Sequence, residues 1–326
     1  MKLLTKIEYA NAILQARLFN RKIPLVVSWE ITKQCNARCK YCYIWDAPSE
    51  ELGTAEALSM IDELKSLGTK SLHFTGGEPL LRQDIGTLLE HCHTQGISTS
   101  MNSNGSFVPL KINEIARLSL LKISLDGPEE VHDYIRGDRS YREAIEGIVA
   151  AKNKGMNVWL TAVLSKYNLH AIDFLLEKAA EFDAPILFQP ATELVLGKDM
   201  QNPLMPEKEK YRQAIKGLIL KKKKTRCIAN SISGLKFLYT WPEINRIHCL
   251  ANLISCRIES DGRICICYRN QIGAKKISGQ KPSFKDVFSG LPFVYCDRCC
   301  CAPTVEINCL LSLKLDTLTN SYRYYL

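Results

Sequence analysis

Six short apolar runs alternate with longer amphipathic stretches through the first two thirds of the chain, and this alternation is the feature that most limits the fold. Strands that alternate with helices form parallel β-α units with right-handed connections. We therefore expect an α/β fold, a partial (β/α)6 TIM-like barrel. The strands are predicted at 25–31, 71–74, 97–102, 121–125, 157–164 and 186–189, and the helices near 54–67, 83–94, 111–118, 140–154, 169–182 and 207–223.

Polar segments follow each of the first four predicted strands. A loop with three cysteines follows the first, GGEP the second, NSNG the third and LDG the fourth. The carboxyl ends of parallel strands lie at one rim of a barrel or sheet, where active sites form. The order of these segments therefore predicts one shared site.

Three cysteines occur within eight residues in the first of these loops, at Cys35, Cys39 and Cys42. No histidine and no fourth cysteine lies close to them in the sequence. A structural zinc site uses four closed ligands. Three thiolates instead leave one iron of a four-iron cluster without a protein ligand, and that iron is free to hold a substrate or cofactor.

The C-x3-C-x2-C spacing, with Tyr41 before the last cysteine, resembles the signature of the radical S-adenosylmethionine (SAM) enzymes. The resemblance implies a [4Fe–4S] cluster on Cys35, Cys39 and Cys42, with SAM chelating the fourth iron. It also implies reductive cleavage of SAM to a 5′-deoxyadenosyl radical, which takes hydrogen from a substrate C–H bond. A flavodoxin or ferredoxin would supply the electron.

Further motifs of this family resemble segments at the next two strand ends. TGGEPLL places Gly76 and Gly77, which would let the backbone approach a ligand closely, before Glu78, which would accept hydrogen bonds from the SAM ammonium group. MNSNGS resembles the Asn-Gly turn of the family, so Asn104 is expected near SAM. Gly-Gly and Asn-Gly are also common turn sequences. The interpretation as SAM-binding segments therefore depends on their positions after the second and third predicted strands.

The segment KISLDG resembles the fourth-strand segment of the family that contacts SAM. Ser124 and Asp126 alternate with apolar residues and share one face of the strand, which is the interior of a barrel. Arg136 follows near the same rim, where its guanidinium would bind the SAM carboxylate. A surface salt bridge is the alternative for Arg136.

Nine of the fourteen cysteines lie between Cys249 and Cys309. Cys249, Gly262 and Cys267 have the spacing C-x12-G-x4-C, and a CxxC follows at Cys296. This resembles the SPASM or twitch extension of radical SAM enzymes, and ESDGRICIC predicts a hairpin around Asp261 and Gly262. The resemblance implies one auxiliary iron–sulfur cluster, with zinc as the alternative metal, on Cys249, Cys267, Cys296 and Cys299.

The cysteine pattern departs from a complete two-cluster SPASM domain after Cys299. A second auxiliary cluster remains an alternative, while Cys256 and Cys300 also suit buried thiols that only pack. The predicted domains are an N-terminal helix at 1–24, the radical SAM core at 25–225 and the auxiliary domain at 226–326. The candidate ligands of a second auxiliary cluster are Cys256, Cys265, Cys301 and Cys309.

The resemblance implies an enzyme that oxidises or cross-links a peptide, because the extension resembles those of peptide-modifying maturases. Only residues 1–24 precede the predicted core, so a separate protein would recognise the peptide, or the substrate is a lipid or small metabolite. A non-catalytic iron–sulfur or zinc protein is the alternative of another class. Methyl transfer by a polar mechanism would need no cysteine cluster.

The net charge of +9 comes partly from KKKKTR at 221–226. This run predicts a solvated helix end and no nucleic-acid partner, because it lacks interleaved aromatic residues. No apolar run reaches membrane-spanning length and no signal peptide is evident, so we expect a cytoplasmic protein. Residues 1–22 predict a basic helix packed on its own domain, with attachment to a membrane surface as the alternative; its apolar residues are Leu3, Ile7, Ala10, Leu14 and Leu18.

Overall fold

A mixed sheet organises the chain in the computed structural model, which describes residues 3–47, 50–243, 247–267, 274–276, 283–296 and 299–324. Its strand order is β10-β9-β8-β1-β2-β3-β4-β5-β6, and the pairs from β1 to β6 are all parallel. Each predicted strand agrees with an observed one to within two residues, which confirms the α/β fold. The six are β1 (Val26–Thr32), β2 (Ser71–Gly76), β3 (Ser98–Ser103), β4 (Leu120–Ser124), β5 (Val158–Leu164) and β6 (Ile186–Pro190).

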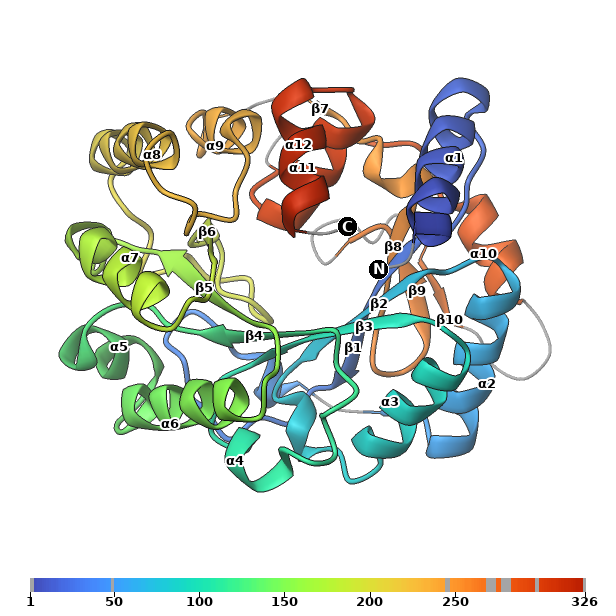
Figure 1. Cartoon of the computed structure of the whole chain (residues 1–326), viewed down its shortest axis with the longest axis horizontal. Helices are drawn as coiled ribbons and strands as arrows, with labels where there is room; N and C mark the ends of the chain where they lie inside the picture. Colours follow the sequence, from blue (N-terminus) through green and yellow to red (C-terminus); the bar gives the residue numbers. More distant parts are fainter. Residues whose placement is uncertain are drawn as a thin grey trace.

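Helices α2 to α7 lie around the outside of the curved sheet (Figure 1). Most agree with the predicted helical stretches, since their apolar residues recur at helical spacing and pack on the strands. They and the following helix are α2 (Thr54–Ser66), α3 (Ile85–Thr94), α4 (Val108–Lys111), α5 (Glu129–Arg136), α6 (Ser140–Asn153), α7 (Ile172–Glu181) and α8 (Lys208–Lys222).

Two helices differ from the prediction. The stretch 111–118 is not a helix: only α4 forms, and the chain then continues in turns. Helix α5 was not predicted, because its eight residues are too few for an apolar period to stand out. It follows Pro128, and Gly137 ends it with a φ of +116°.

The two faces of the sheet have different chemistry. Apolar side chains on the outer face, among them Trp29, Phe74 and Ile123, are fully buried against the helices in the main core. Their neighbours in sequence point to the inner, concave face. These inner residues are largely polar and remain partly exposed, as at Ser28, His73, Ser100, Ser124 and Thr161.

The C-terminal third extends the same sheet. Strand β8 (Ser255–Ile258) pairs in parallel with β1, and β9 (Arg263–Cys265) pairs antiparallel with β8. The hairpin predicted around Asp261 and Gly262 is therefore confirmed. A further strand, β10 (Lys275–Lys276), pairs with β9, and a separate pair joins β7 (Ile247–His248) to β11 (Tyr295–Cys296).

Helical periodicity is weak after residue 230, yet this region contains several helices: α9 (Ile232–Leu238), α10 (Phe284–Gly290), α11 (Ala302–Leu311) and α12 (Leu315–Tyr324). Helix α11 packs against Trp159 and Leu187 on the inner face of β5 and β6. Figure 1 shows α11 and α12 between the two ends of the curved sheet. Because α11 is apolar around much of its circumference, an amphipathic period does not reveal it.

The N-terminal helix α1 (Leu3–Phe19) agrees with the prediction for 1–22 within the described residues. Of the five apolar residues predicted on this helix, the side chains of Leu3 and Ile7 lie outside the described part, and Ala10 is exposed. Tyr9 and Ala16 are buried, and Ala16 packs with Leu25, whereas Leu14 and Leu18 are 52% and 63% exposed. No helix among the described residues is long and apolar enough to cross a membrane.

Candidate functional site

The GGEP segment is joined to the start of the three-cysteine loop by backbone hydrogen bonds. The N–H of Gly77 donates to the carbonyl of Thr32, and that of Glu78 donates to Gln34, both at 2.8 Å. A Cβ at Gly76 would lie 2.1 Å from the oxygen of Thr32, and one at Gly77 would lie 2.1 Å from that of Gln34. The close approach expected toward a ligand is thus made to the chain's own backbone.

Glu78 is buried below this junction and connects it to the end of β3. Its Oε1 accepts hydrogen bonds from the hydroxyl of Ser103 at 2.9 Å and the N–H of Leu80 at 3.2 Å, and its Oε2 accepts one from the N–H of Asn104 at 2.8 Å. Burial raises the pKa of Glu78 to about 7. Its charge also contributes to raising the pKa of Cys35, so the two side chains are neighbours.

Asn104 connects the third strand end to the cysteine loop. Its Nδ2 donates to Oδ1 of Asn36 at 2.8 Å, and its Oδ1 accepts from the hydroxyl of Ser106 at 2.7 Å. Asn36 in turn donates to Ser106 at 3.0 Å. These side chains form a closed ring, and Asn36 lies between Cys35 and Cys39, so the turn orients the loop.

The thiols of Cys35, Cys39 and Cys42 are partly buried neighbours. Burial is the main cause that raises their pKa values, to about 11 for Cys35 and about 12 for Cys42. The pKa of Cys39 is also raised by burial, although Arg136 opposes the increase. A metal must therefore displace protons to bind these thiols.

Arg136 and Asp126 form a buried ion pair behind the cysteine loop. Nε of Arg136 donates to Oδ2 of Asp126 at 2.7 Å, and Oδ1 of Asp126 accepts from the N–H of Val163 at 2.8 Å. The guanidinium also hydrogen-bonds Cys39 and lies 5.5 Å from the ring centroid of Tyr41. The alternative of a surface salt bridge is wrong, because Arg136 is only 8% exposed and Asp126 is fully buried.

The two remaining predicted SAM contacts lie on either side of this pair. Tyr41 is buried and packs with Ile135 and Leu204. Ser124 ends β4 on the inner face, where it is partly exposed and in register with Thr161 of β5. Apart from Arg136, which lies in α5, the residues predicted for the SAM site lie near the carboxyl ends of β1 to β4 or in the loops that follow.

The cysteine loop brings thiols together that could bind one iron–sulfur cluster. The thiols of Cys35, Cys39 and Cys42 lie close enough for their charges to act on one another. Thiolates are the usual ligands of such clusters.

The C-terminal cysteines gather in two places. Cys265 lies beside Cys256 and Cys267 at the β8-β9 hairpin. Cys299 hydrogen-bonds Cys296. The residues between them, 297–298, lie outside the described part of the chain.

The other cysteines lie around the second of these groups. Cys300 and Cys301 also act on the pKa of Cys299. Cys249 is close to β11, since its N–H donates to the carbonyl of Val294 at 3.0 Å. Cys309 lies on α11, near the charges of Glu306 and Asp316.

The Radical SAM superfamily pattern matches residues 29–179, which span β1 to α7 and hold the three-cysteine loop. Residues 29–179 belong to the radical SAM superfamily. A domain of this superfamily implies one [4Fe–4S] cluster and SAM. The match covers the strand-end segments at which the sequence predicted the site.

The relatives of this chain are named for different activities. It is 30% identical over 206 residues to Fe-coproporphyrin III synthase of Methanosarcina barkeri, covering 60% of this chain and 51% of the relative. It is 27% identical over 207 residues to mycofactocin maturase MftC of Mycolicibacterium smegmatis, covering 61% and 52%. The chain thus spans about half the length of the curated relatives it matches.

The fold is shared with Streptococcus suis SuiB bound to S-adenosylmethionine. The TM-score is 0.70 at 17% identity, with 87% of this chain and 70% of SuiB covered. SuiB has also been solved bound to its precursor peptide SuiA. At this identity the likeness establishes the fold alone.

Charged residues on the inner face were missed in the sequence. Lys122 and Glu30 are buried there, and Arg257 of β8 pairs with Glu30. Lys122 could have been found, because it lies two residues before Ser124 and therefore shares its face. Arg257 could not, since nothing in the sequence shows that β8 pairs with β1.

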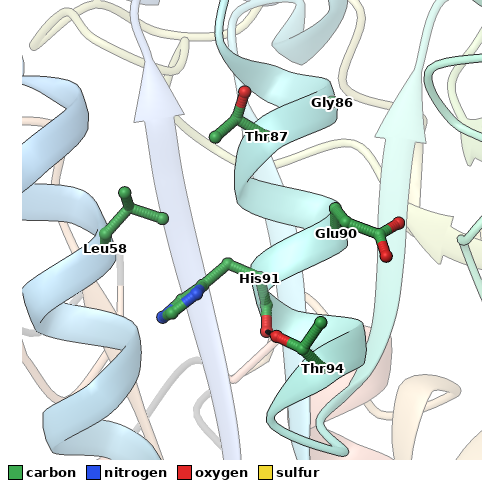
Figure 2. A pocket seen from close by; sticks show the side chains of 6 residues that line it. All are labelled: Leu58, Gly86, Thr87, Glu90, His91 and Thr94. Atoms are coloured by element: carbon green, nitrogen blue, oxygen red, sulfur yellow. Dashed lines mark hydrogen bonds between the residues drawn. The ribbon is translucent and has the colours of Figure 1, made fainter.

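An open hollow on the outside of the radical SAM domain lies apart from this site. Figure 2 shows Leu58 of α2 opposite Thr87, His91 and Thr94 of α3. It is lined by helices of the outer layer rather than by strand ends. A second hollow borders the cysteine loop, with Thr32, Gln34 and Arg82 in its wall.

Proposed function

We propose that this chain is a radical SAM enzyme that oxidises or cross-links a peptide. The observation that carries the proposal is the three-cysteine loop within residues 29–179, held by GGEP and by Asn104 at the rim of a parallel sheet. A [4Fe–4S] cluster, when bound, supplies the electron that cleaves SAM to a 5′-deoxyadenosyl radical. We assign its ligands as Cys35, Cys39 and Cys42.

The chain's own residues would bind and orient the groups around this loop. Arg136 keeps a positive charge next to Cys39, which favours the thiolate that iron requires. Gly76, Gly77, Glu78 and Asn104 hold the loop against two strand ends. We assign Tyr41, Ser124 and Asp126 to the SAM side of the site, with Asp126 acting through Arg136.

A peptide substrate is supported by a relative whose name states one, the PqqA peptide cyclase of Bradyrhizobium diazoefficiens, which is 30% identical over 170 residues. A small metabolite is the second candidate substrate, because the relative of 30% identity is named Fe-coproporphyrin III synthase. Flavodoxin or ferredoxin would supply the electron. A separate protein would present the peptide.

For the region 226–326 we propose one auxiliary iron–sulfur cluster on Cys249, Cys267, Cys296 and Cys299. The pairing of Cys296 with Cys299, and the position of Cys249 near β11, support part of this set. Two clusters, with ligands drawn from Cys256, Cys265, Cys301 and Cys309, are the alternative. Such a cluster would accept the electron that a substrate radical gives up when the substrate is oxidised.

The test is SAM cleavage under strictly anaerobic conditions. Protein reconstituted with iron and sulfide should convert SAM to 5′-deoxyadenosine when dithionite is added, as measured by liquid chromatography and mass spectrometry. The variant C35A/C39A/C42A should form none, whereas C227A, which alters a cysteine outside both clusters, should retain activity. Wild-type protein that binds iron yet releases no 5′-deoxyadenosine would refute the proposal.

A further inference from the structure

Lys122 lies in the middle of the inner face of the sheet. On β4 it is in register with Asn102 of β3 on one side and with Trp159 of β5 on the other. Its side chain is 8% exposed, and its Nζ lies 5.8 Å from the ring centroid of Trp159. The ammonium group is therefore held inside the barrel rather than extended to solvent.

No carboxylate pairs with Lys122 within the part of the chain that the structure describes. Arg257, a partly buried cation on the same face, contrasts with it. Its guanidinium pairs with Glu30 and, at 2.7 Å, with Glu259. Buried charges are normally paired, because removing an ion from water without a partner is costly. An anion that enters the barrel should therefore bind at Lys122 rather than at Arg257, whose charge is already paired.

The groups around Lys122 leave its charge uncompensated. His73, on the neighbouring strand β2, has its pKa lowered by burial and by the charges of Lys122 and Arg257, so it is neutral. Its Nδ1 is hydrogen-bonded to the hydroxyl of Ser100 at 2.8 Å. Asn102, the register partner of Lys122, has an Oδ1 with no hydrogen-bond partner among the residues that the structure describes. An amide rotated by 180° presents its Nδ2 instead and then donates.

From these contacts we propose that Lys122, with Asn102 beside it, binds a carboxylate or phosphate group of the substrate. The inference rests on the proposed function, since it names the substrate class of the same barrel. Ser124 follows Lys122 by two residues, about 7 Å along the strand. An anion at Lys122 would thus be held about that far inside the rim, and the rest of the molecule would reach the cysteine loop.

A thiolate is the competing partner for Lys122. Cys301 lies close enough for its charge to act on the ammonium group. If Cys301 were a cluster ligand, Lys122 would serve to neutralise that cluster. The experiment must therefore distinguish two partners of Lys122. One is an anion that binds from solution, and the other is a metal cluster that stays bound to the chain.

Isothermal titration calorimetry of the anaerobic, iron-loaded protein tests the proposal. Glutarate and inorganic phosphate are the probes, and glutaramide is the uncharged control. We expect wild type to bind at least one of the anions and not glutaramide. K122Q should weaken that binding at least about tenfold, because a charge-assisted hydrogen bond is lost. K122R should retain most of it, and K285Q, on exposed α10, should match wild type.

Thermal unfolding supplies a second readout if K122Q folds poorly. Glutarate or phosphate should raise the melting temperature of wild type by binding the folded state, and it should not raise that of K122M. Equal binding by wild type and K122Q, no binding by wild type, or loss of iron in K122Q would each overturn the proposal. Because the titration involves no turnover, failure of SAM cleavage would refute the proposed function separately.

Discussion

Gly77 and Gln34 approach so closely that a single methyl group would not fit between them. A Cβ on Gly77 would lie 2.1 Å from the carbonyl oxygen of Gln34, which already accepts a hydrogen bond from the N–H of Glu78 at 2.8 Å. Gln34 is the residue before Cys35. The end of β2 therefore fixes where the three-cysteine loop begins.

We expect G77A to destabilise the fold and to displace the loop, because backbone atoms cannot move aside as a side chain can. The loss should be about 2–4 kcal/mol in the free energy of unfolding, with less iron bound per chain. Denaturant unfolding and iron analysis measure the two effects. G217A is the control, since Gly217 lies in α8 and no described atom lies within 4 Å of its Cβ position. It should be neutral or stabilising by up to about 1 kcal/mol.

The positions of β1 to β6 could be predicted because each apolar run is short, bounded by turn residues and followed by a helical period. The same pattern predicted that Cys35, Glu78 and Asn104 lie at one rim of the sheet, at the carboxyl ends of its strands. It could not foresee that glycine is required there for backbone contact with Gln34. That requirement arises from the distance between two strand ends, and a single sequence does not contain it.

Removing one partner of the buried pair between Arg136 and Asp126 should be strongly destabilising. D126N leaves the guanidinium buried without a full counter-charge, and we expect a loss of about 3–5 kcal/mol in the free energy of unfolding. The double variant D126N/R136M should recover part of it, because no unpaired charge remains. Denaturant unfolding measures both values.

The exposed pair between Arg117 and Glu90, at 3.1 Å, is the matched control. R117M should change the free energy of unfolding by less than about 1 kcal/mol, since solvent screens exposed ion pairs. A D126N protein as stable as wild type would show that Arg136 finds another partner. In that case the assignment of Asp126 as the residue that positions Arg136 would fail.

Glu306 on α11 should make stability depend on pH. It is 5% exposed, its Oε1 accepts from the N–H of Ser231 at 2.8 Å, and its Oε2 has no hydrogen-bond partner in the described part of the chain. Burial is the main cause that raises its pKa from 4.5 to about 7. The folded state thus keeps a proton that the unfolded state loses. The contribution of the protonated carboxyl to the free energy of unfolding is therefore complete below about pH 4.5 and is lost by about pH 7.

Replacing this carboxyl by an amide removes the dependence. The stability of E306Q relative to wild type should rise by about 2–3 kcal/mol between pH 5 and pH 8. Denaturant unfolding of both proteins at several pH values gives the difference. E209Q, on an exposed face of α8, should show no such trend. A flat difference for E306Q would mean that Glu306 is charged in the fold throughout.

The C-terminal region shows where sequence reasoning stops. The hairpin at Asp261 and Gly262 was evident from its turn residues, but the parallel pairing of β8 with β1 was not, because the partners are more than 200 residues apart. That pairing places Arg257 inside the barrel and Cys256 on the outer face. Alternation along a strand assigns faces only once the neighbouring strand is known.

The position of Cys256 gives a prediction that distinguishes ligands from packing thiols. Cys256 is buried in the main core together with Ile258, on the side of β8 that faces the helices. Cys299 instead lies against Cys296 and is partly exposed. With one auxiliary cluster, wild type should hold about eight irons, C256A about eight, and C299A about four. Iron and sulfide analysis of the three proteins, purified anaerobically, measures this directly.

Cys267 is the natural second test on the ligand side, since it lies next to Cys265 at the partly exposed end of the hairpin. If C256A lost about four irons, Cys256 would be a cluster ligand rather than a packing thiol, and about twelve irons in wild type would mean two auxiliary clusters.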